Sequence, residues 1–181
     1  MIAAGPVGGW VAESEGGQRS LEHAKQLAPS AKDAMAKSWA AGVQDKDTLA
    51  KYQAVLDAAG KERLDLGGSP GQDIGYSIDL RNALIHYQPE FLPASGRPSP
   101  KRTPKSKSRS EALEVGLRGK FPLNPWYKET GNPFFPYKYL GHGCAEWAVR
   151  SSLAFLGAFF ERLGVASMYE ALRPHLATRS T

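Results

Sequence analysis

Residues 76–87, YSIDLRNALIHY, are the stretch from which the rest of the chain can be interpreted. Apolar residues in and just before this stretch recur at the spacing typical of one buried helical face, at Ile74, Ile78, Leu84, Ile85 and Tyr87. Polar residues interrupt this face. On a helix Asn82 and His86 lie one turn apart and share a side, whereas Arg81 lies about 100° round the axis from Asn82. The Arg81 side chain is long enough to reach back toward both.

Arg81, Asn82 and His86 match the R-N-x-x-x-H form of the Rx4–6H motif, and in this the chain resembles the HEPN superfamily (higher eukaryotes and prokaryotes nucleotide-binding). The motif covers six residues, and a weaker similarity extends to the helical layout of the whole chain. Members of the superfamily are small all-α bundles, and many are metal-independent ribonucleases that work as dimers. The resemblance implies a single HEPN-like helical domain over residues 1–181 and a homodimer that cleaves RNA, such as a toxin or an antiviral defence effector.

Metal-independent RNA cleavage needs a base for the 2′-hydroxyl proton, an acid for the leaving 5′-oxygen and positive charge on the phosphorane. Neutral His86 suits the base, because histidine exchanges protons readily near neutral pH. Arg81 would hold the scissile phosphate and stabilise the charge of the transition state, because its planar guanidinium is always charged. Asn82 would orient one of them or the phosphate. The resemblance implies that these residues converge from two protomers, with the second histidine as acid, and that products carry 2′,3′-cyclic phosphate and 5′-hydroxyl ends.

The sequence departs from one form of this superfamily. Some HEPN toxins carry a tyrosine two residues after the histidine, where a partner nucleotidyltransferase can modify it; here that position is Gln88, and Tyr87 comes one residue earlier. An antitoxin or nucleotidyltransferase partner is therefore an expectation of the resemblance alone. The alternative for Arg81 and His86 is an interhelical ion pair or a buried core histidine. In that case the chain is a non-catalytic HEPN-like module that binds nucleotide, RNA or a protein partner.

The composition predicts a folded core, and the resemblance implies the all-α class. Its 181 residues suit one domain of ordinary size, and 41% are hydrophobic, whereas 19 glycines and 13 prolines indicate long connections. We expect an up-and-down helical bundle of four to six helices, with a long basic loop and an irregular aromatic segment. A formal charge of +5 and a pI near 9.3 favour nucleic acid over a basic substrate as the partner.

The single cysteine, Cys144, excludes an intrachain disulfide and a Cys-rich zinc site, and it fits a reducing cytoplasm. The start, MIAAGPVGGW, lacks the basic and apolar regions of a signal peptide. The longest uncharged apolar stretch, residues 151–160, falls far below the ~20 residues that span a bilayer. We therefore expect a cytoplasmic protein without a membrane segment.

No cofactor or metal is predicted. The chain has neither a Walker loop nor a G-x-G-x-x-G in a βαβ setting. His142, Cys144 and Glu146 are close in sequence but lack a second His/Cys pair. Cys144 is better interpreted as a small buried residue than as a nucleophile.

Local signals predict further helices along the chain. One runs from Ser20 to Ala28 and a short one from Ala31 to Ala41. A third begins at the N-cap Asp47 and ends at Gly60, and the longest runs from Gly143 to Leu163 with Gly164 after it. The broad apolar face of this helix favours several packing neighbours or a dimer interface, and it comprises Ala145, Ala148, Val149, Ser152, Phe155, Leu156, Phe159, Phe160 and Leu163. Ser167 and Glu170 form a capping box for a short final helix.

Residues 96–110 form a segment with six basic and no acidic side chains among repeated serines and prolines. Such a composition cannot bury enough apolar surface to order itself, so we expect a mobile basic insertion. It is either an electrostatic arm for RNA phosphates or a solvated linker. The basic residues are Arg97, Lys101, Arg102, Lys105, Lys107 and Arg109.

Residues 121–139 hold seven aromatic side chains among four prolines, with Lys128 and Lys138 between them. The rings could stack nucleic-acid bases, or the segment could simply pack across the open end of a bundle, which is the commoner arrangement. The aromatic residues are Phe121, Trp126, Tyr127, Phe134, Phe135, Tyr137 and Tyr139.

Overall fold

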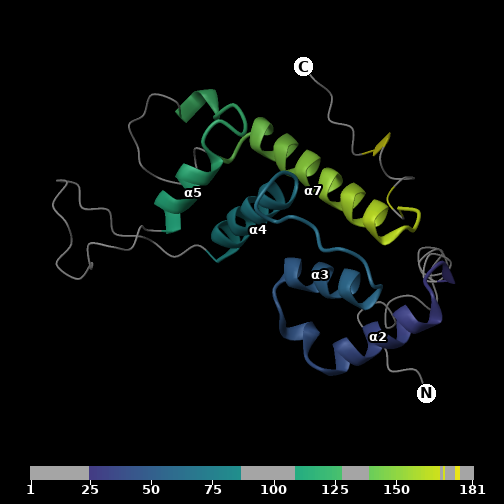
Figure 1. The fold of residues 1–181 in the computed structure, drawn as a ribbon. Coiled ribbons are helices and arrows are strands. Elements are labelled where there is room, and N and C mark those ends of the chain that lie inside the picture. Colours follow the sequence, from purple (N-terminus) through teal and green to yellow (C-terminus); the bar gives the residue numbers. More distant parts are fainter. Residues whose placement is uncertain (1–24, 87–108, 128–138, 168, 170–173, 176–181) are drawn as a thin grey trace, which may run out of the picture. The chain divides into compact units, whose positions relative to one another are not determined.

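The structure is a computed structural model that describes residues 25–86, 109–127, 139–167, 169 and 174–175. No strand is assigned to these residues, which confirms the all-α class. Figure 1 draws their helices as coiled ribbons. The up-and-down order of a bundle stays a prediction. The helices of the described residues are α2 (Pro29–Ala40), α3 (Thr48–Ala58), α4 (Gly71–Ile85), α5 (Arg109–Leu117) and α7 (His142–Leu163), with short 3-10 turns η1 (Val43–Asp45) and η2 (Pro125–Tyr127).

The chain divides into two compact units. Unit 1 comprises Met1–Gly71 and Leu153–Thr181, and unit 2 comprises Gln72–Ser152. Helix α7 therefore contributes its second half to unit 1 and its first half to unit 2. The single domain inferred from the resemblance stays a prediction.

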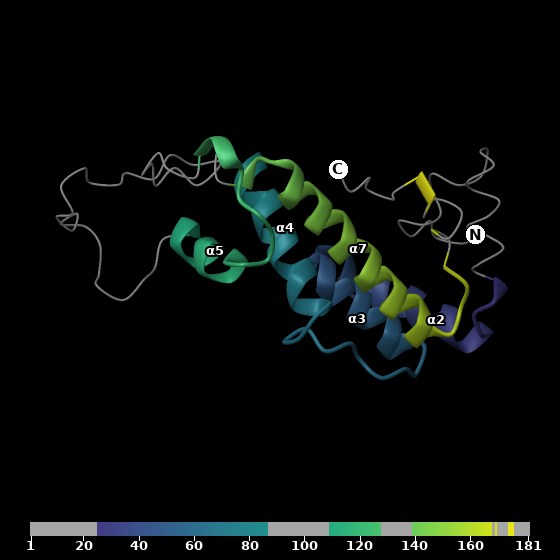
Figure 2. The same cartoon turned by 90° about the horizontal axis from the view of Figure 1, so that it is seen from above.

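In unit 1, α2 and α3 pack against each other, as Figures 1 and 2 both show. Helix α2 has Pro29 in its first turn, where a missing N–H costs nothing. Helix α3 begins as predicted: the carboxylate of Asp47 accepts a hydrogen bond of 2.8 Å from the N–H of Ala50. Gly60, with φ of +66°, follows its end in a backbone conformation that glycine adopts without strain.

The core of unit 1 joins α3 to the second half of α7. Leu56 is fully buried against Phe159 and Leu163. Tyr52 packs edge-on against Phe159, with ring centroids 4.8 Å apart, and in the same manner against Phe155. Helix α7 runs one residue longer at its start than predicted, and Gly164 follows its end at φ of +76°, as expected.

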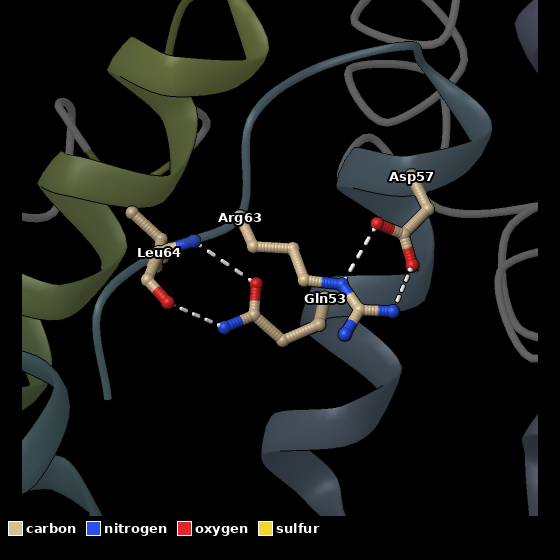
Figure 3. A network of polar contacts seen from close by, with 4 residues as sticks. All are labelled: Gln53, Asp57, Arg63 and Leu64. Carbon is tan, nitrogen blue, oxygen red and sulfur yellow. Dashed lines mark hydrogen bonds and ion pairs between the residues drawn. The ribbon is translucent and has the colours of Figure 1, made fainter. Parts of the chain in front are cut away.

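Three polar interactions hold the connection that leaves α3. The Gln53 side chain accepts from the N–H of Leu64 at 3.0 Å and donates to the C=O of Leu64 at 2.7 Å (Figure 3). Arg63 binds both carboxylate oxygens of Asp57, at 2.9 and 2.8 Å, and this hydrogen bonding lowers the pKa of Asp57. Glu62, in the same connection, forms an ion pair with Arg162 of α7 at 2.8 Å. The extended residues 61–64 are thus held by side chains rather than by a strand partner.

The core of unit 2 is formed by α4, α5 and the start of α7 (Figure 2). From α4 it takes Leu80 and Ala83, and Tyr76 and Leu84 pack against it while partly exposed. Cys144 contributes from α7 and is buried, as predicted. The remaining buried members are Leu113, Leu117, Phe121 and Tyr139.

The predicted buried face of α4 is wrong in one part. Ile85 is 58% exposed, and Leu80 and Ala83, which the pattern did not include, are buried instead. Of the predicted members, Leu84 packs against the core, Ile74 and Ile78 are half-buried, and Tyr87 lies outside the described residues. The reason is that the packing partner, α5, selects the face of α4 that is buried, and this partner leaves no trace in the sequence of α4.

The basic segment is shorter than predicted at its C-terminal end. Arg109 and Ser110, assigned to the mobile insertion, are the first two residues of α5. Residues 96–108 lie outside the described part of the chain. Helix α5 itself was not predicted, although its buried residues Leu113 and Leu117 have helical spacing.

Two predictions fall at the edges of the described residues. The first predicted helix is described only from Lys25, and α2 begins at Pro29. Near the C-terminus, the Ser167 hydroxyl accepts from the N–H of Tyr169 at 3.2 Å, whereas Glu170 and the rest of the predicted final helix lie outside.

In α7, the predicted face included Ala145, which is exposed. Across the helices that the structure describes, none has the length and apolar character needed to cross a membrane.

Gly116 fixes how closely α5 approaches α4. A Cβ atom at this position would lie 2.3 Å from Cε1 of Tyr76 and 2.6 Å from its Cζ, so the tyrosine ring covers the glycine directly. A ring held by two packed helices cannot withdraw by more than an ångström without opening the core. The glycine is therefore required for contact and not for backbone freedom.

Gly116→Ala is expected to destabilise the protein by up to about 2 kcal/mol, because overpacking costs about 1–3 kcal/mol and alanine adds only ~1 kcal/mol in a helix interior. In a Tyr76→Ala background the same substitution is expected to be neutral or stabilising. Urea unfolding of the four proteins of this double-mutant cycle measures the difference. Equal effects in both backgrounds would contradict the predicted contact.

Candidate functional site

Helix α4 presents the three residues of the sequence motif at the surface of unit 2. Leu80 and Ala83 face the core, and a helix turns about 100° per residue, so Arg81 and His86 point away from it. Arg81 and His86 are exposed, and Asn82 is half-buried. The alternative of a buried core histidine is therefore excluded.

Arg81 reaches back toward Asn82, as its length predicted. Its Nη1 donates a hydrogen bond of 2.9 Å to Oδ1 of Asn82. His86 follows one turn later, and its backbone N–H donates to the C=O of Asn82 at 2.9 Å, so helical geometry continues to the histidine. The guanidinium of Arg81, the amide of Asn82 and the imidazole of His86 thus occupy little more than one turn of one helix.

No partner in the described part of the chain occupies the whole Arg81 guanidinium or the His86 imidazole. The hydrogen bond to the side-chain amide of Asn82 uses one of the five N–H donors of the Arg81 guanidinium. Among the residues that the structure describes, Arg81 forms no ion pair and no side chain bonds the His86 imidazole. The interhelical ion pair is therefore not formed within this part of the chain, and an anion could bind here without displacing a carboxylate.

The structure does not bring the predicted basic residues to this set. Arg97, Lys101, Arg102, Lys105 and Lys107 lie outside the described residues. Arg109 begins α5. Their role as RNA-binding residues therefore stays a prediction from composition.

The aromatic segment separates into core and surface residues. Phe121 and Tyr139 are buried and pack edge-on with ring centroids 5.9 Å apart, and Phe121 also contacts Trp147. Packing is therefore confirmed for these two rings. Trp126, in η2, is 83% exposed. Phe134, Phe135 and Tyr137 lie outside the described residues, as do Lys128 and Lys138.

The start of α7 holds polar groups that do not converge on one point. The His142 Nε2 lies 3.9 Å from Oε2 of Glu146, which also forms an ion pair with Arg150. Cys144 instead points into the core, and burial raises the pKa of its thiol to about 11. Within the described ranges, no three His, Cys, Asp or Glu side chains gather closely enough to hold a metal ion.

One polar contact near the motif helix had no signal in the sequence. Lys120, just after α5, forms an ion pair with Asp73 of α4 at 2.6 Å, and both side chains are largely buried. Asp73 lies in the first turn of α4, where a carboxylate is favoured by the helix dipole. The pair links residues 47 positions apart, so neither local spacing nor composition could have found it.

Comparison with known proteins adds no relative. No protein-family model matches the chain, and it has no significant match among curated proteins or solved structures. The motif and its geometry therefore carry the functional argument alone.

The buried Tyr139 and Cys144 predict a loss of stability at alkaline pH. Burial raises the pKa of Tyr139 from 10.0 to about 12 and that of Cys144 from 9.0 to about 11. The folded chain keeps these protons where the unfolded chain releases them, so the stabilisation is complete below pH 9 and is lost progressively as the pH rises toward 12.

Tyr139→Phe should flatten the decline in unfolding free energy above pH 10, because phenylalanine has no proton to lose. Urea unfolding at pH 8, 9.5 and 11 measures the decline for the parent and the variant. The same slope in both would mean that Tyr139 does not titrate differently on folding.

Proposed function

We propose that this chain is a metal-independent endoribonuclease of the HEPN type. The observation that supports the proposal most is the arrangement at the end of α4. Arg81 and His86 are both exposed. Asn82, which lies between them in the sequence, accepts a hydrogen bond from the guanidinium of Arg81. These are the residue types that phosphodiester cleavage by 2′-hydroxyl attack requires. A net charge of +5 suits a polyanionic substrate.

In the proposed reaction, the neutral imidazole of His86 takes the proton of the 2′-hydroxyl. The 2′-oxygen attacks the adjacent phosphorus in line with the bond to the leaving 5′-oxygen. Negative charge grows on the two non-bridging oxygens, and the N–H donors of Arg81 that Asn82 does not use stabilise it. Because the amide of Asn82 fixes the fork before substrate arrives, less side-chain freedom is lost on binding.

The leaving 5′-oxygen needs a proton from an acid, and one imidazole cannot take and give a proton in the same step. In our proposal, a second copy of the chain supplies its own protonated His86 for this purpose, so the active form is a homodimer. The P–O5′ bond breaks, and the products carry a 2′,3′-cyclic phosphate and a 5′-hydroxyl. Such an enzyme would act in the cytoplasm as a toxin or defence nuclease, with an antitoxin to restrain it.

A second candidate function retains RNA binding without cleavage. The observation that favours it is that no described side chain orients the His86 ring. A general base in an enzyme is commonly held by a third group. In this second function Arg81 and Asn82 bind a phosphate or nucleotide, and His86 contacts the ligand without transferring a proton.

The two functions are separated by a cleavage assay with single-stranded and structured RNA in EDTA. His86→Ala is expected to lower the rate by at least about 100-fold, because general base catalysis contributes ~10²–10⁴. Arg81→Ala should reduce it about as far, and Arg81→Lys should restore only part, because lysine lacks the planar fork. Mass spectrometry of the products identifies the cyclic phosphate.

Matched controls are available elsewhere in unit 2. His142 and Arg118 are exposed and lie outside the motif, so His142→Ala and Arg118→Ala should cleave at the parent rate. If cleavage persists in both His86→Ala and Arg81→Ala, the proposed chemistry is wrong. If the parent binds RNA but cuts none, the second candidate replaces the first.

The basic segment provides a separate test of RNA binding. Replacing Lys101, Arg102, Lys105 and Lys107 with glutamine should weaken binding to single-stranded RNA. The slope of log K against log salt should fall by up to about 3, because each phosphate contact on a single strand contributes ~0.7.

The matched control removes four exposed lysines of unit 1 and so changes the net charge equally. The quadruple glutamine variant at Lys32, Lys37, Lys46 and Lys61 should retain the parent slope. An unchanged slope in the first variant would identify residues 96–108 as a linker.

A further inference from the structure

Within the described part of the aromatic segment, Trp126 lies at the surface on a backbone that hydrogen bonds hold. The N–H of Trp126 donates to Oδ1 of Asn124 at 3.1 Å, and Nδ2 of Asn124 donates to the C=O of Leu140 at 2.9 Å. One asparagine therefore fixes η2 to the residues that precede α7. The indole of Trp126 remains 83% exposed.

Close packing of two glycines also holds residues 122–124. A Cβ on Gly143 would lie 2.8 Å from Cγ of Pro122, and one on Gly141 would lie 3.3 Å from Cβ of Asn124. Both glycines thus lie directly against residues 122–124. The ring of Trp126 is carried by a backbone that two hydrogen bonds and two close contacts position.

Two exposed apolar side chains accompany Trp126. Leu123 is next to Asn124 in the chain, and Leu140 provides the carbonyl that Asn124 binds; they are 37% and 53% exposed. A single exposed apolar residue is ordinary, whereas here three exposed apolar residues, one of them aromatic, lie in or next to one hydrogen-bonded junction. Of the three aromatic side chains of this segment whose burial the structure describes, Phe121 and Tyr139 are buried and Trp126 is exposed.

We propose that Trp126 is a stacking site for an unpaired base of single-stranded RNA. The inference rests on RNA as the substrate of the proposed function. An exposed indole on a fixed backbone offers a flat face that any base can stack on, and such stacking tolerates many sequences. The chain has 23 Lys and Arg against 18 Asp and Glu, so a polyanion is favoured over a basic or a neutral apolar partner. Duplex RNA, whose bases are already stacked, would not use the site.

The test is binding of a fluorescein-labelled, twelve-nucleotide 2′-O-methyl oligo(U), measured by fluorescence anisotropy. The 2′-O-methyl group blocks cleavage by 2′-oxygen attack, so binding is measured apart from chemistry. Trp126→Ala is expected to bind about 5- to 100-fold more weakly than the parent, and Trp126→Phe should recover part of the affinity because it keeps a ring. Quenching of tryptophan emission by the oligonucleotide should decrease in Trp126→Ala.

Val115→Ala is the matched control, because Val115 is an exposed apolar residue of unit 2 that lies outside this junction. It should bind as the parent does, and all variants should retain the parent's melting temperature. A 2′-O-methyl duplex of the same length should lose little affinity on Trp126→Ala. Parent-like binding of the single strand by Trp126→Ala, an equal loss in Val115→Ala or an equal loss on the duplex would overturn the proposal.

The outcome is distinguishable from that of the proposed function. A parent that cleaves RNA while Trp126→Ala binds normally would refute the stacking site and leave the nuclease intact. A parent that cuts nothing, with binding that depends on Trp126, would support the stacking site and refute the nuclease. A parent that does not bind the oligonucleotide refutes the stacking site in either case.

Discussion

The contact between α4 and α5 is the constraint on which the rest of unit 2 depends. The ring of Tyr76 covers Gly116, and Leu80 and Ala83 are buried with Leu113 and Leu117. This contact sets the rotation of α4 about its own axis. Because side chains on a helix are separated by fixed angles, one buried face determines every exposed one. Arg81 and His86 reach solvent as a consequence of where Leu80 lies.

A different rotation would be costly in two ways. Turning α4 by one residue would move the guanidinium of Arg81 into the position of Leu80, and burying an unpaired charge costs several kcal/mol. It would also expose leucine surface, at about 25 cal/mol per Å². The partly buried ion pair of Asp73 with Lys120 favours the same rotation from the first turn of the helix. Apolar packing and the placement of charges therefore favour the same rotation of α4, in which Arg81 and His86 are exposed.

Helix ends could be predicted from the sequence because their causes are local. Asp47 bonds a backbone N–H three residues away, and Gly60 and Gly164 adopt positive φ directly after their helices. The buried faces could not be predicted as well, because they depend on partners distant in sequence. Ile85 and Ala145 fit an apolar pattern and yet are exposed, whereas Leu80 and Ala83, which the pattern did not include, are buried. The candidate site was found because its three residues lie on one helix. The roles of Phe121 and Trp126 were not separable, since composition does not distinguish a ring in the core from one at the surface.

Gln53 shows how a helical protein can order an extended connection without a sheet. Its amide satisfies both the N–H and the C=O of Leu64, as a neighbouring strand would. Recognition through the main chain does not depend on the identity of the residue at position 64, but it does require a side chain with both a donor and an acceptor at position 53. A glutamate or lysine there would leave one peptide group unsatisfied. In evolutionary terms, the connection can drift in sequence more freely than the helix residue that holds it.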